Sequence, residues 1–456
     1  MLIIVSDLHL ADGTCGKPIS SSAFSLFADR LNELAYNASW RADGRYRPID
    51  GIDILLLGDI LDPQHSTLWL DKNIKEPGSV RPWTNIHAPQ YAEKLRQITQ
   101  AILKRNTDSI SILHSLAQSK AIRLPPATRH GKPAKIVLER VHVPVRIHYM
   151  TGNHDWQYHI PGPAFDEIRR EIVNAIGLSN PVTAFPHQMK ESSTIAELLS
   201  GYKMHAQHGD IYDKFNYRQD VGRDAAALGD AFAVQVLNRF PVEAERKLGN
   251  ELPAGLIDGL REFVNVRPAL ATPLWISGQL QQNNVGKKEQ NKLKQVWDSL
   301  TEEFLELDFV RQFDKRLKFD IVDGLEMLIK LTKRASFQTI DDIVVWMRQK
   351  MWSGEISFSQ NALKEEAFIK RKAQYIVYGH THHQEIVPLD MIPSAPRPTN
   401  QIYINSGTWH TYYDLAIYKP KEQKFIPYQV LTYLAFYKDG ERGGRHFETW
   451  SGAFSE

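Results

Sequence analysis

The chain has 456 residues, of which 42% are hydrophobic and 24% are charged, and its net charge is +2. This composition is typical of globular proteins of one to three domains, and it excludes a chain that is disordered over most of its length. The single cysteine, Cys15, excludes an internal disulfide and favours a reducing compartment. The apolar run at residues 2–5 is too short for a signal peptide or membrane span, so we expect a cytoplasmic protein without a transmembrane segment.

Five short apolar runs predict buried strands, and each run stops at a loop that contains Asp, Asn or His. In chain order the runs are 2–5, 54–57, 145–150, 202–207 and 375–378. Ligand sites in layered α/β sheets gather beyond the carboxyl ends of the strands. The repeated pattern therefore predicts an α/β fold whose functional site lies beyond these five strand ends.

Helical patterns fill much of the remaining chain, first at residues 89–118 and 164–176. From about residue 220 the strand-then-ligand pattern stops and amphipathic spacing replaces it, as in the steps of four, four and three from Val296 to Leu307. The same spacing continues at 321–331 and 340–347. We predict a mostly helical insertion at 219–371, interpreted as a candidate cap, between catalytic segments 1–218 and 372–456. Its tryptophans are expected in the core; they are Trp275, Trp297, Trp346 and Trp352.

The first two strand ends carry carboxylates and a histidine. Asp7 and His9 follow the first strand, and an oxygen beside an imidazole suits a borderline divalent cation such as Mn, Fe, Zn or Co. Asp59 follows the second strand in the segment Gly58-Asp59-Ile60-Leu61-Asp62, and one carboxylate can bridge two cations. Taken alone, each motif is better explained by a polar loop cap or an ordinary turn than by a metal site.

The third strand end reads Gly152-Asn153-His154-Asp155. The Asn153 amide oxygen is a neutral ligand, and the adjacent His154 can then reach a substrate. Asp155 is expected to hold the imidazole in one tautomer and raise its pKa, which would make His154 an acid for a leaving group. An ordinary turn rich in polar residues would explain the same four residues.

Three further histidines follow the last two strands. His208 begins the segment His208-Gly209-Asp210, and a buried, hydrogen-bonded histidine would also explain it. His380 and His382 alternate after the fifth strand, so they can share one side of the chain. Two imidazoles at one strand end need polar partners, which favours a ligand role for both.

The five motifs occur in the order D-x-H, G-D-x-x-D, G-N-H-D, H-G-D and G-H-x-H, and this ordered set resembles the calcineurin-like metallophosphoesterase family. The resemblance covers residues 1 to about 215 and about 372 to 410. It implies a central β-sandwich flanked by helices, with the active site at the strand ends. It also implies hydrolysis of a phosphomonoester, phosphodiester or pyrophosphate bond.

The resemblance further implies two divalent metal ions, such as manganese, iron, zinc, cobalt or nickel. One metal would be held by Asp7, His9, Asp59 and His382, and the second by Asp59, Asn153, His208 and His380. Asp59 would bridge the two, and a hydroxide between them would attack phosphorus in line. His154 would stabilise the transition state or protonate the leaving oxygen, and Asp155 would orient it.

The expected partner is a phosphorylated substrate, and the net charge leaves nucleic acid open. The D-x-H-L start and the H-G-D motif are similar to the branch that contains UDP-2,3-diacylglucosamine hydrolases, although those chains are shorter. Mre-type DNA-repair nucleases share the D-x-H-L start, which makes a DNA or RNA nuclease an alternative. A non-enzymatic protein-binding scaffold, as in a retromer subunit, is the other alternative, and the intact motifs argue against it.

Overall fold

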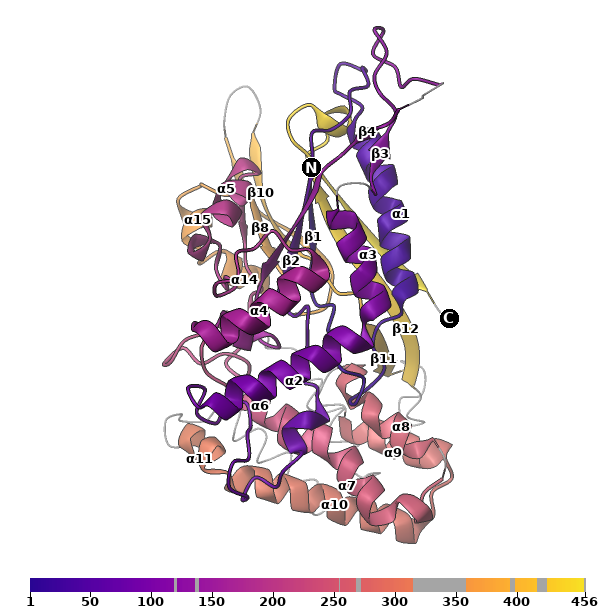
Figure 1. Ribbon diagram of the computed structural model, residues 1–456, viewed down its shortest axis with the longest axis vertical. Coiled ribbons are helices and arrows are strands. Elements are labelled where there is room, and N and C mark those ends of the chain that lie inside the picture. Colours follow the sequence, from indigo (N-terminus) through magenta and orange to yellow (C-terminus); the bar gives the residue numbers. More distant parts are fainter. Residues whose placement is uncertain are drawn as a thin grey trace.

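The computed structural model describes residues 1–118, 121–135, 139–253, 255–267, 272–314, 358–393, 398–415 and 425–454. These residues form a mixed α/β fold, as the sequence predicts, with helices packed around two main sheets (Figure 1). All five apolar runs contain strands, although the fourth strand is confined to residues 204–206. No helix within these ranges is both long enough and apolar enough to cross a membrane.

The larger sheet is built around three parallel strands. These are β1 (Leu2–Val5), β2 (Ile52–Leu57) and β5 (Val145–Met150), in the order β5-β2-β1. The sheet continues from β1 through the antiparallel β12 (Phe425–Phe436) to β11 (Thr411–Leu415) and β7 (Val266–Arg267), while β13 (Phe447–Phe454) pairs with β12. Because β1, β2 and β5 are parallel, their carboxyl ends meet at one edge, where the first three motifs begin.

The smaller sheet has the order β6-β8-β10-β9. Its strands are β6 (Met204–Ala206), β8 (Tyr375–Tyr378), β9 (Glu385–Ile392) and β10 (Thr399–Asn405). β6, β8 and β10 run parallel, so the two remaining motifs also begin at neighbouring strand ends. A separate two-stranded ribbon, β3 (Arg123–Leu124) with β4 (Val141–His142), lies near the amino end of β1 (Figure 1).

Alternate side chains of the central strands enter two different hydrophobic clusters. Leu2 and Ile4 of β1 share a buried cluster with Met204 and Val377, and this cluster joins the two sheets. Ile3 of β1 instead packs in the cluster formed with the helices α1 (Ser21–Ala38), α2 (Pro89–Arg105), α3 (Thr107–Ala117) and α4 (Pro163–Ile176). Burial on both faces explains why these strands read as continuous apolar runs.

The helical stretch at 89–118, for which the sequence allows one long helix or two, is two helices. α2 ends at Arg105 and α3 begins at Thr107, while the Asn106 amide donates to the carbonyls of Ile102 and Ala11. Asn106 is buried, and its side chain thus ties the junction to the loop that follows β1. The residue favours a break because it satisfies helix-end carbonyls with its own amide.

The described part of the predicted insertion is mostly helical and has its own hydrophobic cluster. Its main elements are α6 (Leu228–Phe232), the π-helical η5 (Ala233–Asn238), α7 (Arg239–Leu248), α8 (Leu256–Arg261), α9 (Thr272–Gln282), α10 (Lys287–Glu306) and α11 (Asp308–Asp314). Trp275 and Trp297 pack in this cluster together with Val296. These helices gather at the end of the molecule opposite to β3 and β4 (Figure 1). The segments 321–331 and 340–347, with Trp346 and Trp352, lie outside the described residues.

The last part of the 219–371 segment packs elsewhere. α14 (Phe358–Ala362) and α15 (Glu366–Ile369) contribute to a small cluster with Ile376, Tyr378 and Tyr403 of the smaller sheet. Glu365 accepts hydrogen bonds from the hydroxyls of Tyr212 and Tyr378. These two short helices therefore cover the outer face of the smaller sheet and do not join the helical cluster.

Candidate metal centre

The seven residues predicted as metal ligands come together at the strand ends. Asp7, His9 and His382 form one group whose nitrogen and carboxylate atoms lie within 4.8 Å of one another, and Asp59, His208 and His380 form a second. Asn153 joins the second group, because its Oδ1 lies 2.9 Å from Nδ1 of His380. Residues that are up to 375 positions apart in the sequence are thus neighbours in the fold.

Five of the seven residues have a backbone conformation that non-glycine residues rarely adopt. They are Asp7 (φ 54°), His9 (φ 45°), Asp59 (φ 56°), His380 (φ 70°) and His382 (φ 62°). Such left-handed positions cost free energy and cluster at ligand-binding and active sites. In the described residues only four other non-glycine positions share a positive φ, so this backbone strain is concentrated at the candidate centre.

Glycines make room for the close approach of these side chains. A Cβ atom on Gly58, whose φ is 85°, would lie 2.5 Å from Nδ1 of His208. A Cβ on Gly152 would collide with Oδ1 of Asp59 and lie 2.7 Å from the His208 ring. Packing therefore requires the glycines that precede Asp59 and Asn153, and Gly58 also needs the backbone freedom of glycine because of its positive φ.

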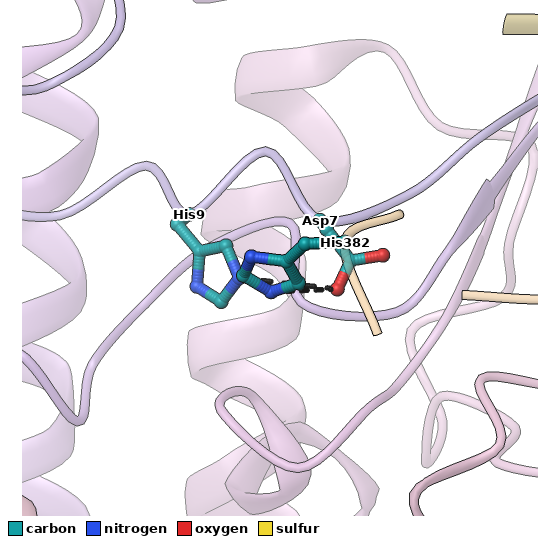
Figure 2. A group of neighbouring side chains, drawn as sticks. All are labelled: Asp7, His9 and His382. Atoms are coloured by element: carbon teal, nitrogen blue, oxygen red, sulfur yellow. Dashed lines mark hydrogen bonds and ion pairs between the residues drawn. The ribbon is translucent and has the colours of Figure 1, made fainter. Parts of the chain in front are cut away.

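The first group is compact. Nε2 of His382 lies 3.0 Å from Nε2 of His9 and 3.2 Å from Oδ1 of Asp7. Figure 2 shows the His382 ring between the His9 ring and the Asp7 carboxylate. Nε2 of His9 is also 3.9 Å from Oδ2 of Asp59, which connects this group to the second one.

The second group is centred on Asp59 and His208. Nε2 of His208 lies 3.1 Å from Oδ2 of Asp59 and 4.0 Å from Oδ1 of Asp7. The Asp59 carboxylate thus faces histidines of both groups, while its Oδ1 accepts a hydrogen bond of 2.8 Å from the backbone N–H of His154. This position suits a carboxylate that bridges two cations.

Three of the histidines have their second ring nitrogen engaged by an oxygen. Nδ1 of His9 lies 2.9 Å from Oδ2 of Asp62, Nδ1 of His208 lies 2.9 Å from the carbonyl of Leu57, and Nε2 of His380 lies 3.0 Å from Oδ2 of Asp213. If each of these nitrogens donates its proton, the other nitrogen presents a lone pair to the centre. This outer arrangement is the usual one for histidines that bind metals.

Two buried atoms at the centre, Oδ1 of Asp7 and Nε2 of His208, form no well-aligned hydrogen bond among the described residues, although His382 and Asp59 lie 3.2 Å and 3.1 Å from them. Asp7 and Asp59 are at most 1% exposed, and across the described ranges neither forms an ion pair with a lysine or arginine. Buried charges need compensation. The carboxylate, amide and imidazole donors fit borderline divalent cations, which would supply that compensation.

The charges in the centre are strongly coupled. Burial raises the pKa of Asp7, and the neighbouring Asp59 adds to that effect. Burial also opposes the ionisation of Asp59, yet His208 and His154 hold its pKa well below the usual range. Burial disfavours the charge on His208, but Asp59 and Asp7 raise the pKa of its imidazole to about 10. The carboxylates therefore create a negative potential that attracts positive charge.

His154 lies beside the centre, but Asp155 does not orient it as expected. The Asp155 carboxylate accepts hydrogen bonds from the hydroxyl of Tyr149 at 2.6 Å and from the backbone N–H groups of Ile60 at 2.9 Å and Gly152 at 2.6 Å. It therefore holds the two motif loops together. The sequence interpretation that Asp155 orients His154 is therefore wrong. It relied on the two residues being adjacent in the chain, whereas the Asp155 side chain contacts Tyr149 and two backbone N–H groups.

The carboxylate that contacts His154 is Asp62. Its Oδ2 lies 3.0 Å from Nδ1 of His154, 2.9 Å from Nδ1 of His9 and 2.7 Å from Nδ1 of His65. Burial disfavours the charge on His154, yet Asp62 and Asp59 raise its pKa to about 9. Asp62 was visible as the last letter of the G-D-x-x-D motif, whereas no sequence signal pointed to His65 or to Asp213.

A second buried network links the centre to the start of the predicted insertion. Arg223 donates from Nη1 to the carbonyl of Gly152 at 3.0 Å, and its Nη2 contacts the carboxylate of Asp210 and, at 2.6 Å, Nε2 of His187. Asp210 is the last residue of the H-G-D motif and is fully buried. Its function in the fold is thus to hold Arg223 against the Gly152 loop.

No family model matches this chain, and no curated protein matches it either. An assignment of function therefore depends on the geometry of the site.

Proposed function

We propose that this protein is a dinuclear metal phosphoesterase, and that its two packed sheets form the β-sandwich of the calcineurin-like phosphoesterase fold. One observation carries the proposal: seven donor residues of the right chemical types converge from five strand ends, around the buried pair Asp7 and Asp59. The backbone strain at five of these residues supports a functional rather than a purely structural reason for the cluster.

One cation would be held by Asp7, His9, Asp59 and His382, and a second by Asp59, Asn153, His208 and His380. When bound, two such cations activate a water molecule and neutralise charge that develops on a phosphoryl group. The two carboxylates bring only two negative charges against four positive ones. An anionic phosphate would therefore be attracted to the site.

His154 would supply the proton for the leaving oxygen. Its Nδ1 faces Asp62, so that Nε2 is the nitrogen free to donate. The Asp62 carboxylate favours the protonated imidazole, because it raises the pKa of His154. Asp62 positions the ring, and its contacts with His9 and His65 fix the carboxylate in turn. General acid catalysis of this kind typically contributes about 10²–10⁴-fold to the rate.

The proposed substrate class is a phosphomonoester, phosphodiester or pyrophosphate. A scaffold without activity would not require the complete donor set together with an oriented His154, which supports an enzyme over a protein-binding role. The proposed localisation remains cytoplasmic, and the proposed metals are Mn, Fe, Zn, Co or Ni.

The test combines metal analysis with turnover of bis(p-nitrophenyl) phosphate and p-nitrophenyl phosphate. We expect about two bound divalent ions per chain and hydrolysis of at least one probe, lost on chelation and restored by Mn²⁺. Asp108→Asn is a matched control, because Asp108 is an exposed carboxylate on α3. A protein that binds fewer than one ion per chain and cleaves neither probe with any of the five metals would contradict the proposal.

A further inference from the structure

A second, smaller site lies between the loop at residues 70–81 and the helical elements η5 and α7. The structure has a cavity of about 280 Å³ there, near the lower end of the roughly 300–1,000 Å³ range of small-molecule sites. None of the candidate metal ligands lines it. The polar and charged residues that determine the electrostatics of the cavity are Lys72, Arg81, Gln235, Arg239, Glu243 and Arg246.

Arg81 is the unusual member of this set, because its guanidinium is buried without a carboxylate partner among the residues described. The residue is 2% exposed, and its Nη atoms donate to the carbonyls of Trp69, Val80 and Lys72. Its Nε has no hydrogen-bond partner there. Asp71, whose charge acts on Arg81, already lies 2.6 Å from Lys94. A buried charge without an opposite charge is costly, so it calls for an anion.

The other charges of the cavity leave an excess of positive charge. Arg239 pairs with Glu303 at 2.7 Å, and Arg246 pairs with Glu243 at 2.7 Å. Those two pairs cancel, whereas Lys72 forms no ion pair within the described chain and Arg81 forms none either. The cavity therefore carries about two uncompensated positive charges on one wall. Burial lowers the pKa of Arg81 to about 10, as expected for a cation that lacks an opposite charge.

The opposite wall supplies an unused polar group. Gln235 is 1% exposed, and its Oε1 also lacks a hydrogen-bond partner among the described residues. It belongs to the π-helical η5, and π-helical turns occur frequently at functional sites. Three residues further on, Asn238 donates to the carbonyl of Gln64 at 2.9 Å. Buried polar groups are normally satisfied, and Gln235 and Arg81 both line the cavity, so a polar ligand that these two side chains turn to meet would satisfy their covered Oε1 and Nε atoms.

We propose that this cavity is a second anion site, which binds a phosphate group between the 70–81 loop and the helical insertion. Oxygens of the anion would accept from Arg81 and Lys72, and a hydroxyl of a partly protonated phosphate would donate to Gln235. Because η5 also contacts Gln64, next to His65, an anion in this cavity would stabilise the position of the insertion beside the metal centre. The simpler alternative is that Arg81 only ties the carbonyls of its own loop together.

The experiment uses the metal-free full-length protein, so that phosphate cannot bind through cations at the metal centre. Inorganic phosphate and pyrophosphate are titrated by isothermal calorimetry at low ionic strength. The variant Lys72→Ala/Arg246→Ala removes two exposed cations of the cavity without touching the core. The matched control Lys247→Ala removes an exposed cation next to Arg246 that does not line the cavity. Arg81→Gln tests the buried cation, with circular dichroism to verify its fold.

We expect saturable binding of one anion per chain, weakened at least tenfold by Lys72→Ala/Arg246→Ala and unchanged by Lys247→Ala. The double variant loses the charge-assisted hydrogen bond from Lys72 and a second positive charge at the cavity, which account for a loss of this size. Arg81→Gln, if it keeps its fold, should also bind the anion at least tenfold more weakly. The proposal is overturned if the metal-free protein shows no saturable binding, or if the double variant and the control bind equally well. Both outcomes are independent of whether the metal-loaded protein hydrolyses phosphate esters.

Discussion

Oδ2 of Asp62 lies 3.0 Å from Nδ1 of His154, and the same oxygen lies 2.9 Å from Nδ1 of His9. One buried carboxylate therefore orients both the proposed acid and a proposed metal ligand. Burial opposes the ionisation of Asp62, but His65 and His154 hold its pKa well below the usual range. This shared contact links the geometry of the proposed acid to that of the candidate metal centre.

Replacement of Asp59 should damage the centre more than replacement of Asp7. Both carboxylates face histidines of the two groups, since Asp59 lies 3.9 Å from His9 and Asp7 lies 4.0 Å from His208. The expected difference rests on the proposed ligand sets, in which Asp59 alone is shared by the two cations. We expect Asp59→Asn to retain close to no metal and Asp7→Asn to retain about one ion per chain. Metal content is measured by elemental analysis together with turnover of a chromogenic diester. Two retained ions and unchanged turnover in Asp59→Asn would remove the bridging role.

His154→Ala should keep its metals and lose turnover in a way that depends on the leaving group. A poor leaving group needs the proton from His154, so its hydrolysis should fall about 10²–10⁴-fold. Nitrophenolate is a good leaving group and should be affected much less. The comparison uses phenyl and nitrophenyl phosphate esters under saturating metal. Equal losses for both esters would show that His154 does not act as the acid.

The substitutions Asp62→Asn and Asp155→Asn should have different consequences, the first for catalysis and the second mainly for stability. Asp62→Asn should show the leaving-group dependence of His154→Ala, because the imidazole loses the carboxylate that raises its pKa, and it should also weaken metal binding, because Asp62 contacts His9 as well. Asp155→Asn should mainly lower stability, by about 1–3 kcal/mol, because it disturbs three buried hydrogen bonds to the motif loops. Urea denaturation and pH–rate profiles separate the two effects. An altered pH–rate profile in Asp155→Asn alone would return the orienting role to that residue.

The sequence predicts the strands from local patterns, and it predicts the donor residues through the ordered set of motifs that resembles a known family. A strand buried between two layers has a continuous run of apolar residues in the sequence, and a site beyond the end of the strand has polar residues directly after that run. The partners of the donors depend on how distant loops approach each other, which no local pattern encodes. Asp62 meets His154 across 92 positions. Likewise, residues 358–369 lie on the smaller sheet because Tyr378 and Tyr403 offer an apolar face there.

The stability of the fold should also depend on pH through His159, which is not one of the proposed metal ligands. Its Nδ1 lies 2.6 Å from Oδ1 of Asp224 and its Nε2 lies 3.4 Å from Oε2 of Glu191. Burial disfavours the charge, but the two carboxylates raise the pKa of His159 to about 9.

Because this pKa is raised in the folded state, the stabilisation is complete below about pH 6.5 and is lost as the pH rises through 9. We expect a loss of roughly 1–2 kcal/mol, reduced by solvent screening of the partly exposed partners. Chemical denaturation at pH 6 and pH 9.5 measures it, with His159→Asn as the variant that should remove the dependence. An unchanged slope in that variant would assign the pH effect to other groups.

The helical cluster should restrict access to the metal centre. Two hydrogen bonds place it beside the motif loops: Asp230 accepts from Nε1 of Trp156 at 3.0 Å, and Asn238 donates to the carbonyl of Gln64 at 2.9 Å. The variant that tests this replaces residues 228–357 with a Gly/Ser linker. It retains Arg223 at the Gly152 loop and Glu365 at the smaller sheet.

Under the cap hypothesis, this variant keeps its metals and cleaves small chromogenic diesters at least as fast as the full chain, because nothing covers the centre. Its preference among phosphodiesters of increasing size should shift, since the surface that selects the larger ones is gone. Metal analysis, circular dichroism and kcat/KM for a size series of diesters are the measurements. The alternative is that the helical cluster contributes only to stability or dimerisation. An unchanged size preference, with only a lower melting temperature or a dissociated oligomer, would establish that alternative.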